Sequence, residues 1–299
     1  MKNFKYSLMV LLGGIMYGTM SSFVKLSYAS GYHAAEIAFS MSLISAVLLG
    51  VALLFSNRKI NRVKLRGKSA ISLLLVGSLI GLTNFLYYLS VSYISASLAI
   101  VILMQFTWFS LLLEWLIFRQ RPGRLELAIV LFILVGTVMA GNLFQAEALS
   151  FSWRGMAFAL ASSFTYAVYI VANSRVGKEV KWQSKSTLIM IGSALIIFIV
   201  NARTIVSDSH LNYTFLLWAV FLAAVGTTIP TALFAASIPK IGAATSAILM
   251  TVEFPVAVLC AYIVLHEAIS PVQIAGIIMM LASIAAMNYY KSSKTKKES

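Results

Sequence analysis

Acidic residues and cysteine are scarce in this sequence of 299 residues. Only nine positions are Asp or Glu, and the single cysteine, Cys260, lies within an apolar run. One cysteine allows neither a disulfide within the chain nor a cysteine metal cluster. The three histidines, His33, His210 and His266, are scattered over predicted loops, so an enzyme site built from a nucleophile and a base, or from a metal, is not expected. We therefore predict no catalysis and no cofactor.

Charge of either sign is also low. Charged residues make up 11% of the chain and hydrophobic residues 60%, whereas a soluble domain is about 25% charged and about 45–50% apolar. The net charge of +14 alone is compatible with a nucleic-acid binder, but the basic residues form short clusters between long apolar runs. A nucleic-acid binder would spread them over a folded face. With a mean hydropathy of +0.91, the chain is predicted to lie in the lipid bilayer and to bind no nucleic acid.

Ten apolar runs are long enough to cross the hydrocarbon core as helices of about 20 residues. The runs lack the alternation of apolar and polar residues that is typical of a membrane β-barrel. The fold class is therefore predicted to be an all-α membrane protein with ten transmembrane helices. We expect these helices at 6–29, 33–55, 69–90, 93–118, 125–142, 154–174, 185–203, 213–236, 241–265 and 271–290.

Basic residues predict the orientation of the helices. If the N-terminus is cytoplasmic, all but three of the 23 Lys and Arg residues fall on the cytoplasmic side. The exceptions are Lys25, within a helix, and Arg154 and Arg203 in outer loops. Because positive charge marks cytoplasmic loops, we predict a multi-pass protein of the cell inner (plasma) membrane with both termini in the cytoplasm.

The two halves of the chain resemble each other. Residues 93–136 align with 238–283 at a shift of 147 positions, which sets Ala96 against Ala243. Similarly, Tyr17 in the first helix pairs with Tyr166 in the sixth. This similarity predicts two five-helix repeats, 1–149 and 150–299.

The number of helices in each repeat determines how the repeats are arranged. Five is odd, so the second repeat enters the membrane from the opposite side. Inverted repeats place the substrate site near the midplane between them. A central cavity is therefore expected, enclosed by the two halves.

Three ionisable residues within or near the apolar runs are candidates for function: Lys25, Glu114 and Glu253. Such groups cost about 2.5–3.5 kcal/mol on insertion scales and usually face a cavity. Glu253 is the deepest in its helix, and Pro255 is expected to kink that helix and free the Thr251 carbonyl. We predict that Glu253 binds substrate and couples transport to a proton or another cation. The alternative is a structural acid that is hydrogen-bonded to a neighbouring helix. For Glu114 we predict a local ion pair with Arg119 or Arg121.

Polar and aromatic residues repeat on single helix faces, which in lipid should turn inward. Ser162, Tyr166, Tyr169 and Asn173 follow this spacing in one helix. Interhelical packing without a ligand is the alternative, and we assign that role to the Gly14–Gly18 and Gly77–Gly81 pairs. The predicted substrate-binding residues are Tyr17, Asn84, Tyr88, Gln105, Trp108, Tyr166, Tyr169 and Glu253.

Several stretches resemble the EamA-type transporters of the drug/metabolite transporter superfamily. They are Tyr17–Gly18 with Lys25 downstream, SSFTYAVYIVANSR at 162–175, and IGAATSAILMTVEFPVAVLCAYIVLHEAISPVQIAGIIMMLAS at 241–283. The last is similar to the family's Gly-Ala-Ala, Glu-Pro, Gly-Glu, Gln and Gly pattern. Two positions depart from it: Trp108 replaces a frequent Pro, and Gln120–Arg121 replaces a common Gly-Glu pair. The resemblance implies ten helices around a central cavity and export of small metabolites, amino acids or drugs.

These features together predict a secondary transporter that works by alternating access. Its partner is a small organic solute such as an amino acid, a metabolite or a lipophilic cationic drug, and export is the expected direction. An importer or a solute exchanger on the same fold is the alternative. Both a monomer and a dimer are compatible with the sequence.

Overall fold

The computed structural model describes residues 2–57, 67–94, 96–141, 152–207, 212–266 and 268–297. By length and composition, nine helical segments within these ranges are able to cross a membrane: Phe4–Tyr28, Ala34–Phe55, Gly67–Val91, Leu98–Phe118, Trp153–Arg175, Trp182–Val206, Tyr213–Ile241, Ala243–Val264 and Pro271–Tyr290. Helix α6 (Arg124–Ala140) has 17 residues, which is the lower limit of about 17–25 for a span. With α6, the number of spans is the predicted ten.

The first half contains α1 (Lys2–Ala29), α2 (Ala34–Asn57), α3 (Gly67–Val91), α4 (Ala96–Leu103), α5 (Phe106–Phe118) and α6. The second half contains α7 (Trp153–Arg175), α8 (Trp182–Ser207), α9 (Tyr213–Phe221), the π-helix η2 (Leu222–Thr228), α10 (Ile229–Ile241), α11 (Ala243–Met250), α12 (Glu253–Leu265) and α13 (Pro271–Lys297). The proposed boundary between repeats at 149/150 lies outside the described residues.

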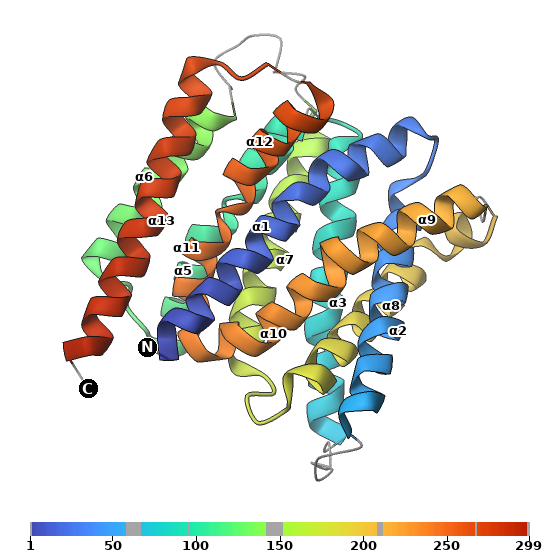
Figure 1. Ribbon diagram of the computed structural model, residues 1–299, viewed down its shortest axis with the longest axis horizontal. Coiled ribbons are helices and arrows are strands. Elements are labelled where there is room, and N and C mark those ends of the chain that lie inside the picture. Colours follow the sequence, from blue (N-terminus) through green and yellow to red (C-terminus); the bar gives the residue numbers. More distant parts are fainter. Residues whose placement is uncertain are drawn as a thin grey trace.

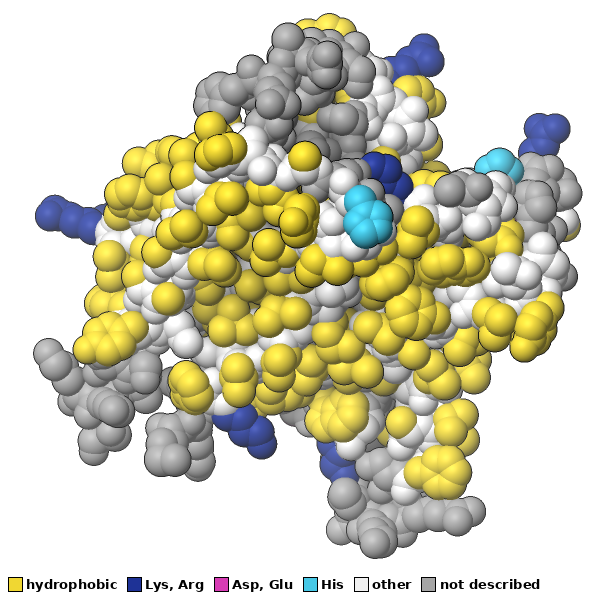
Figure 2. Space-filling model, turned by 45° about the horizontal axis from the view of Figure 1, so that its top comes forward, with side chains coloured by type: hydrophobic (Ala, Val, Ile, Leu, Met, Phe, Trp, Pro, Cys, Tyr) yellow, Lys and Arg dark blue, Asp and Glu magenta, His cyan; other side chains and the backbone are white. Residues whose placement is uncertain are grey.

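Helices dominate because a chain this apolar must satisfy its backbone hydrogen bonds without water. Both chain termini lie at the same end of the bundle, as an even number of spans requires (Figure 1). We call this end the terminal end. Hydrophobic side chains cover much of the face that Figure 2 shows, whereas most of the Lys and Arg side chains visible there project at its outline.

The fourth and ninth spans are each broken in two. The first break, at Met104–Gln105, separates α4 from α5, and the second, at Thr251–Val252, separates α11 from α12. The breaks lie 147 positions apart, which is the shift that aligns the two halves of the sequence. The duplication therefore extends to an irregular feature of the backbone.

Helix contacts repeat in the same way. The first span, α1, packs on α11 and α12 of the second half, and its counterpart α7 packs on α4 and α5 of the first. Likewise, α1 contacts α10, and α7 contacts α3. The chain thus forms two inverted five-helix repeats around a shared interior.

The predicted packing role of the glycine pairs is confirmed. A Cβ on Gly77 would meet the Ile189 carbonyl oxygen, and one on Gly18 would meet the Glu253 carbonyl oxygen. Glycine at these positions lets neighbouring helix backbones approach closely. Gly18 therefore sets the distance between α1 and the break that precedes α12.

Candidate functional site

A cavity of about 60 Å³ lies in the interior shared by the two repeats. This is room for several water molecules. Its walls come from the first, second, third, fourth, sixth, eighth and ninth spans. The lining residues are Tyr17, Gly18, Met20, Met41, Thr83, Asn84, Tyr87, Tyr88, Ile100, Leu103, Met104, Tyr166, Gly226, Glu253 and Ala257.

Glu253 lines this cavity at the start of α12. Its side chain is buried, with the residue 5% exposed, and its Oε2 lies 3.4 Å from the Tyr166 hydroxyl, which donates to it. A first-turn position suits an acid because the helix dipole is positive there. The aligned position in the first half, Phe106, is apolar. The duplicated scaffold therefore carries its acid on one side only.

The backbone before Glu253 differs from the predicted geometry. The helix does break, because Pro255 lacks the N–H that would bond the Thr251 carbonyl. However, that carbonyl accepts a hydrogen bond from the Phe254 N–H at 3.2 Å. The prediction that this carbonyl is free is therefore wrong, and the residue next to the break that does line the cavity is Glu253.

Five of the residues predicted to bind substrate line the cavity: Tyr17, Asn84, Tyr88, Tyr166 and Glu253. The Asn84 amide Nδ2 donates to the Tyr17 hydroxyl at 3.5 Å and joins α3 to α1. The cavity thus brings together five of the eight predicted residues, from α1, α3, α7 and α12.

Gln105 and Trp108 are not among the lining residues; instead they stabilise the first helix break. The Gln105 Nε2 donates to the Val101 carbonyl at 3.2 Å, and its Oε1 accepts from the Trp108 indole N–H at 2.8 Å. Trp108 is 36% exposed and stacks on Phe109. The spacing of these two residues predicted a polar face towards the cavity, but their side chains form a local hydrogen-bond network beside the break.

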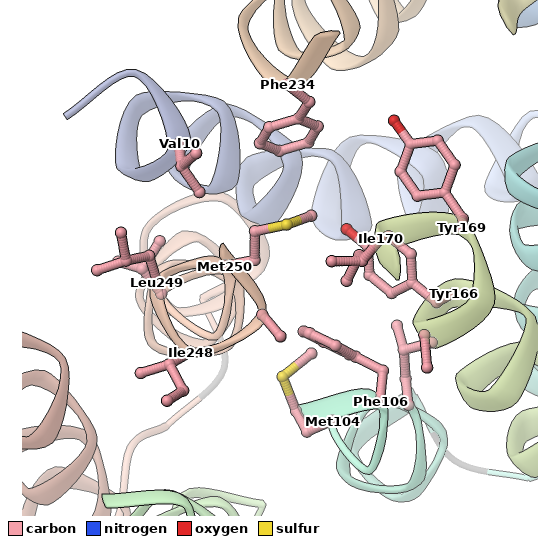
Figure 3. Close-up of a cluster of buried hydrophobic side chains, with 14 of the residues drawn as sticks. Val10, Met104, Phe106, Tyr166, Tyr169, Ile170, Phe234, Ile248, Leu249 and Met250 are labelled. Atoms are coloured by element: carbon pink, nitrogen blue, oxygen red, sulfur yellow. The ribbon is translucent and has the colours of Figure 1, made fainter. Parts of the chain in front are cut away.

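Tyr169 is buried one turn beyond Tyr166, outside the lining. Its hydroxyl accepts a hydrogen bond from Asn173 Nδ2 at 3.3 Å, and its ring stacks on that of Tyr166 with centroids 6.2 Å apart. It belongs to an apolar cluster in which Phe106, Met250 and Phe234 come from three other helices (Figure 3). On the predicted polar face of α7, Tyr166 thus lines the cavity, whereas Tyr169 packs in the core.

The prediction omitted several lining residues. Tyr87, adjacent to Tyr88, has ring contact with it, and Thr83 hydrogen-bonds Thr165 across to α7 at 2.8 Å. Gly226 lies in η2, and π-helical turns frequently occur at functional sites. Pro230, which follows η2 in the same span, is the sequence feature that could have indicated this irregular turn, because proline removes a backbone donor from the helix.

A second, polar pocket of about 330 Å³ lies at the terminal end, lined in part by Glu114, Gln120 and Arg175. An ion pair of Glu114 is confirmed, but its partner is Arg175 of α7, at 3.2 Å, and not Arg119 or Arg121. The Arg175 guanidinium also donates to Gln120 Oε1 at 2.8 Å. The interaction is therefore between helices rather than local.

Lys25 and Lys185 differ in their surroundings. Lys25 is exposed and is not among the cavity-lining residues. Lys185 is buried, and its Nζ donates to the carbonyls of Asn173 and Val176 at 2.7 and 2.9 Å. Its amino group thus lies at the C-terminus of α7, where the helix dipole favours positive charge. Neither side chain is among those that line the cavity.

Comparison with known proteins supports this architecture. A crystal structure aligns with 94% of this chain and 95% of its own, with a TM-score of 0.76 and 15% sequence identity. At that identity, the likeness shows the fold alone. An uncharacterized transporter from Synechocystis sp. (strain ATCC 27184 / PCC 6803 / Kazusa) is 26% identical over 222 residues, 71% of this chain. The chain spans about two thirds, 66%, of that relative's length.

A family model matches each half of the chain separately, at residues 4–141 and at residues 153–289. The two matches fall on either side of the segment that joins α6 to α7. They agree with the repeated helix contacts and with the two aligned breaks. The chain is thus a multi-pass membrane protein, and it belongs to the EamA-like transporter family.

Proposed function

We propose that this protein is a secondary transporter that exports small organic solutes by alternating access. The observation that supports this proposal best is the position of Glu253, a buried acid that lines the cavity between two inverted repeats. Burying an acid away from water is costly, and a substrate that must be bound and released gives that cost a use. Amino acids, metabolites and lipophilic cationic drugs are the proposed solutes, and the plasma membrane, with both termini cytoplasmic, is the proposed location.

Glu253 is also the proposed coupling residue. In this scheme the carboxylate holds either the solute or a proton, so that a proton entering from outside drives solute release. Four tyrosines line the cavity together with Glu253: Tyr17 of α1, Tyr87 and Tyr88 of α3, and Tyr166 of α7. The alternating movement is a rocking of the two repeats about the cavity, as their inverted arrangement allows.

Transport by purified protein in liposomes tests this function. The liposomes would be loaded with labelled phenylalanine or with trimethyl(2-phenylethyl)ammonium, whose permanent charge prevents leakage as a neutral amine. Efflux should increase when the outside is made acidic. The Glu253→Gln variant should lose the response to pH, whereas Glu179→Gln, which changes an exposed loop acid, should retain it.

The same liposomes distinguish proton-coupled export from solute exchange. Efflux that needs unlabelled solute outside, and that ignores the pH gradient, would indicate an exchanger. If neither probe crosses the membrane faster than in protein-free liposomes, the proposed transport of aromatic solutes is wrong. A Glu253→Gln variant with full, pH-responsive efflux would remove Glu253 from coupling.

A further inference from the structure

The charge of the central cavity is one-sided. Glu253 is the one acid among the described lining residues, and Lys, Arg and His are all missing from that set. A buried carboxylate is tolerated when a positive charge or a proton compensates it. Within the part of the chain that the structure describes, the cavity walls supply no such cation.

Basic side chains elsewhere in the interior are already engaged. Arg175 pairs with Glu114 at the terminal end, and the Lys185 ammonium donates to two carbonyls at the end of α7. The amide of Asn84, which does line the cavity, donates to the Tyr17 hydroxyl. An anionic group entering the cavity would therefore meet an acid and no basic side chain among the lining residues that the structure describes.

Apart from Glu253, Asn84 and Thr83, the polar side chains in the described lining are aromatic. Tyr17, Tyr87, Tyr88 and Tyr166 reach the cavity from three helices, and Tyr166 also donates to the Glu253 carboxylate. The electron-rich faces of aromatic rings attract organic cations, by about 2 kcal/mol or more where water is excluded. A carboxylate surrounded by tyrosines matches the chemistry of an ammonium group attached to an apolar body.

We propose that the central cavity selects organic monocations, with the ammonium group paired to Glu253 among the tyrosine rings, over zwitterions and anions. This inference rests on the proposed transport function and narrows its solutes. A zwitterionic amino acid would also bring a carboxylate, and burying that group without a basic partner is unfavourable. Neutral solutes lack the attraction to Glu253.

Four probes that share a phenylethyl group and differ in charge test the selectivity. They are phenethylamine (cation), 2-phenylethanol (neutral), phenylalanine (zwitterion) and 3-phenylpropionate (anion). Binding to the purified full-length protein would be measured from the ligand-dependent rise of its unfolding temperature. Phenethylamine should bind at least tenfold more tightly than each of the other three. Equal or tighter binding of phenylalanine or 3-phenylpropionate, or no binding of phenethylamine, would overturn the proposal.

Variants of Glu253 connect the selectivity to the acid. Glu253→Gln should weaken phenethylamine binding at least tenfold and leave 2-phenylethanol binding unchanged, and Glu253→Asp should keep the preference for the cation. Unchanged amine binding in Glu253→Gln contradicts the proposal. The four-probe series on the unmodified protein decides the question if a variant fails to fold.

Failure of this inference can be told apart from failure of the transport function. If the amine binds selectively but crosses no liposome membrane, transport is wrong and the charge selectivity stands. If phenylalanine is transported as fast as the quaternary cation, the transport function stands and the proposed charge selectivity is wrong.

Discussion

The Arg175 guanidinium lies 3.2 Å from the Glu114 carboxylate and connects the end of α7 to α5. The second carboxylate oxygen, Oε2, accepts a hydrogen bond from the Ala244 backbone N–H at the start of α11, at 3.1 Å. Arg175 also lies over the Phe118 ring, 4.4 Å from its centroid. One acid thus joins three spans, taken from both repeats, at the terminal end of the bundle.

Replacing Arg175 with Ala should weaken this connection. The Glu114 side chain is 8% exposed, so loss of its partner leaves a largely buried charge with fewer hydrogen bonds, at a cost of about 1–3 kcal/mol. The unfolding temperature of the purified protein should fall. Arg154→Ala, at the exposed opposite end of the same helix, is the matched control. Equal shifts in the two variants would show that the ion pair adds no stability.

Gly18 should not tolerate a methyl group. A Cβ there would collide with the Glu253 carbonyl oxygen and lie 3.0 Å from Val256 Cβ, and overpacking of this kind costs about 1–3 kcal/mol. Gly18→Ala should therefore lower the unfolding temperature and weaken solute binding, because it pushes α1 from α12 beside the cavity.

Gly50→Ala is the control for this substitution. The nearest atom to a Cβ at Gly50 is Thr187 Cγ2, at 3.9 Å, and alanine is favoured over glycine in a helix by about 1 kcal/mol. This variant should be as stable as the unmodified protein or more so. A Gly18→Ala protein that matches it in stability and solute binding would contradict the close-packing interpretation.

The sequence predicted the helices better than their interruptions. Apolar length is enough to place the spans, because lipid leaves the backbone few other options. The break at Thr251–Val252 had a signal in Pro255, but the matching break at Met104–Gln105 has no proline. Gln105 and Trp108 show the polar spacing of a cavity face, yet Gln105 donates to the Val101 carbonyl and accepts from the Trp108 indole N–H.

Partners from distant segments were the least predictable part of the site. Glu114 has arginines five and seven positions away in the sequence, but pairs with Arg175 because α7 packs on α5. The same holds for Glu253 and Tyr166, which only tertiary packing brings together. Hydropathy fixes which residues enter the membrane, whereas helix packing decides which of them meet.

The Tyr166 hydroxyl should matter to solute binding more than its neighbours do. Tyr166→Phe removes the donor to Glu253 from the cavity wall and keeps the ring. Amine affinity should therefore fall by about tenfold or more, in line with the loss of a hydrogen bond to a charged group, about 1.5–3 kcal/mol. Tyr169→Phe and Trp108→Ala change residues outside the lining and should leave affinity nearly unchanged. Affinity that depends on Trp108 but not on Tyr166 would place the solute elsewhere.

Lys185 gives a final prediction, about the stability of α7. Its buried Nζ donates to the Asn173 and Val176 carbonyls, so Lys185→Met, which keeps most of the length of the side chain, removes the donor to two acceptors at the helix end. Buried acceptors left without a donor cost about 1–3 kcal/mol, and the unfolding temperature should fall accordingly. Lys178→Met, at an exposed position in the following turn, removes the same charge without those bonds and should have little effect. If the two variants unfold at the same temperature, the Lys185 hydrogen bonds do not stabilise the end of α7.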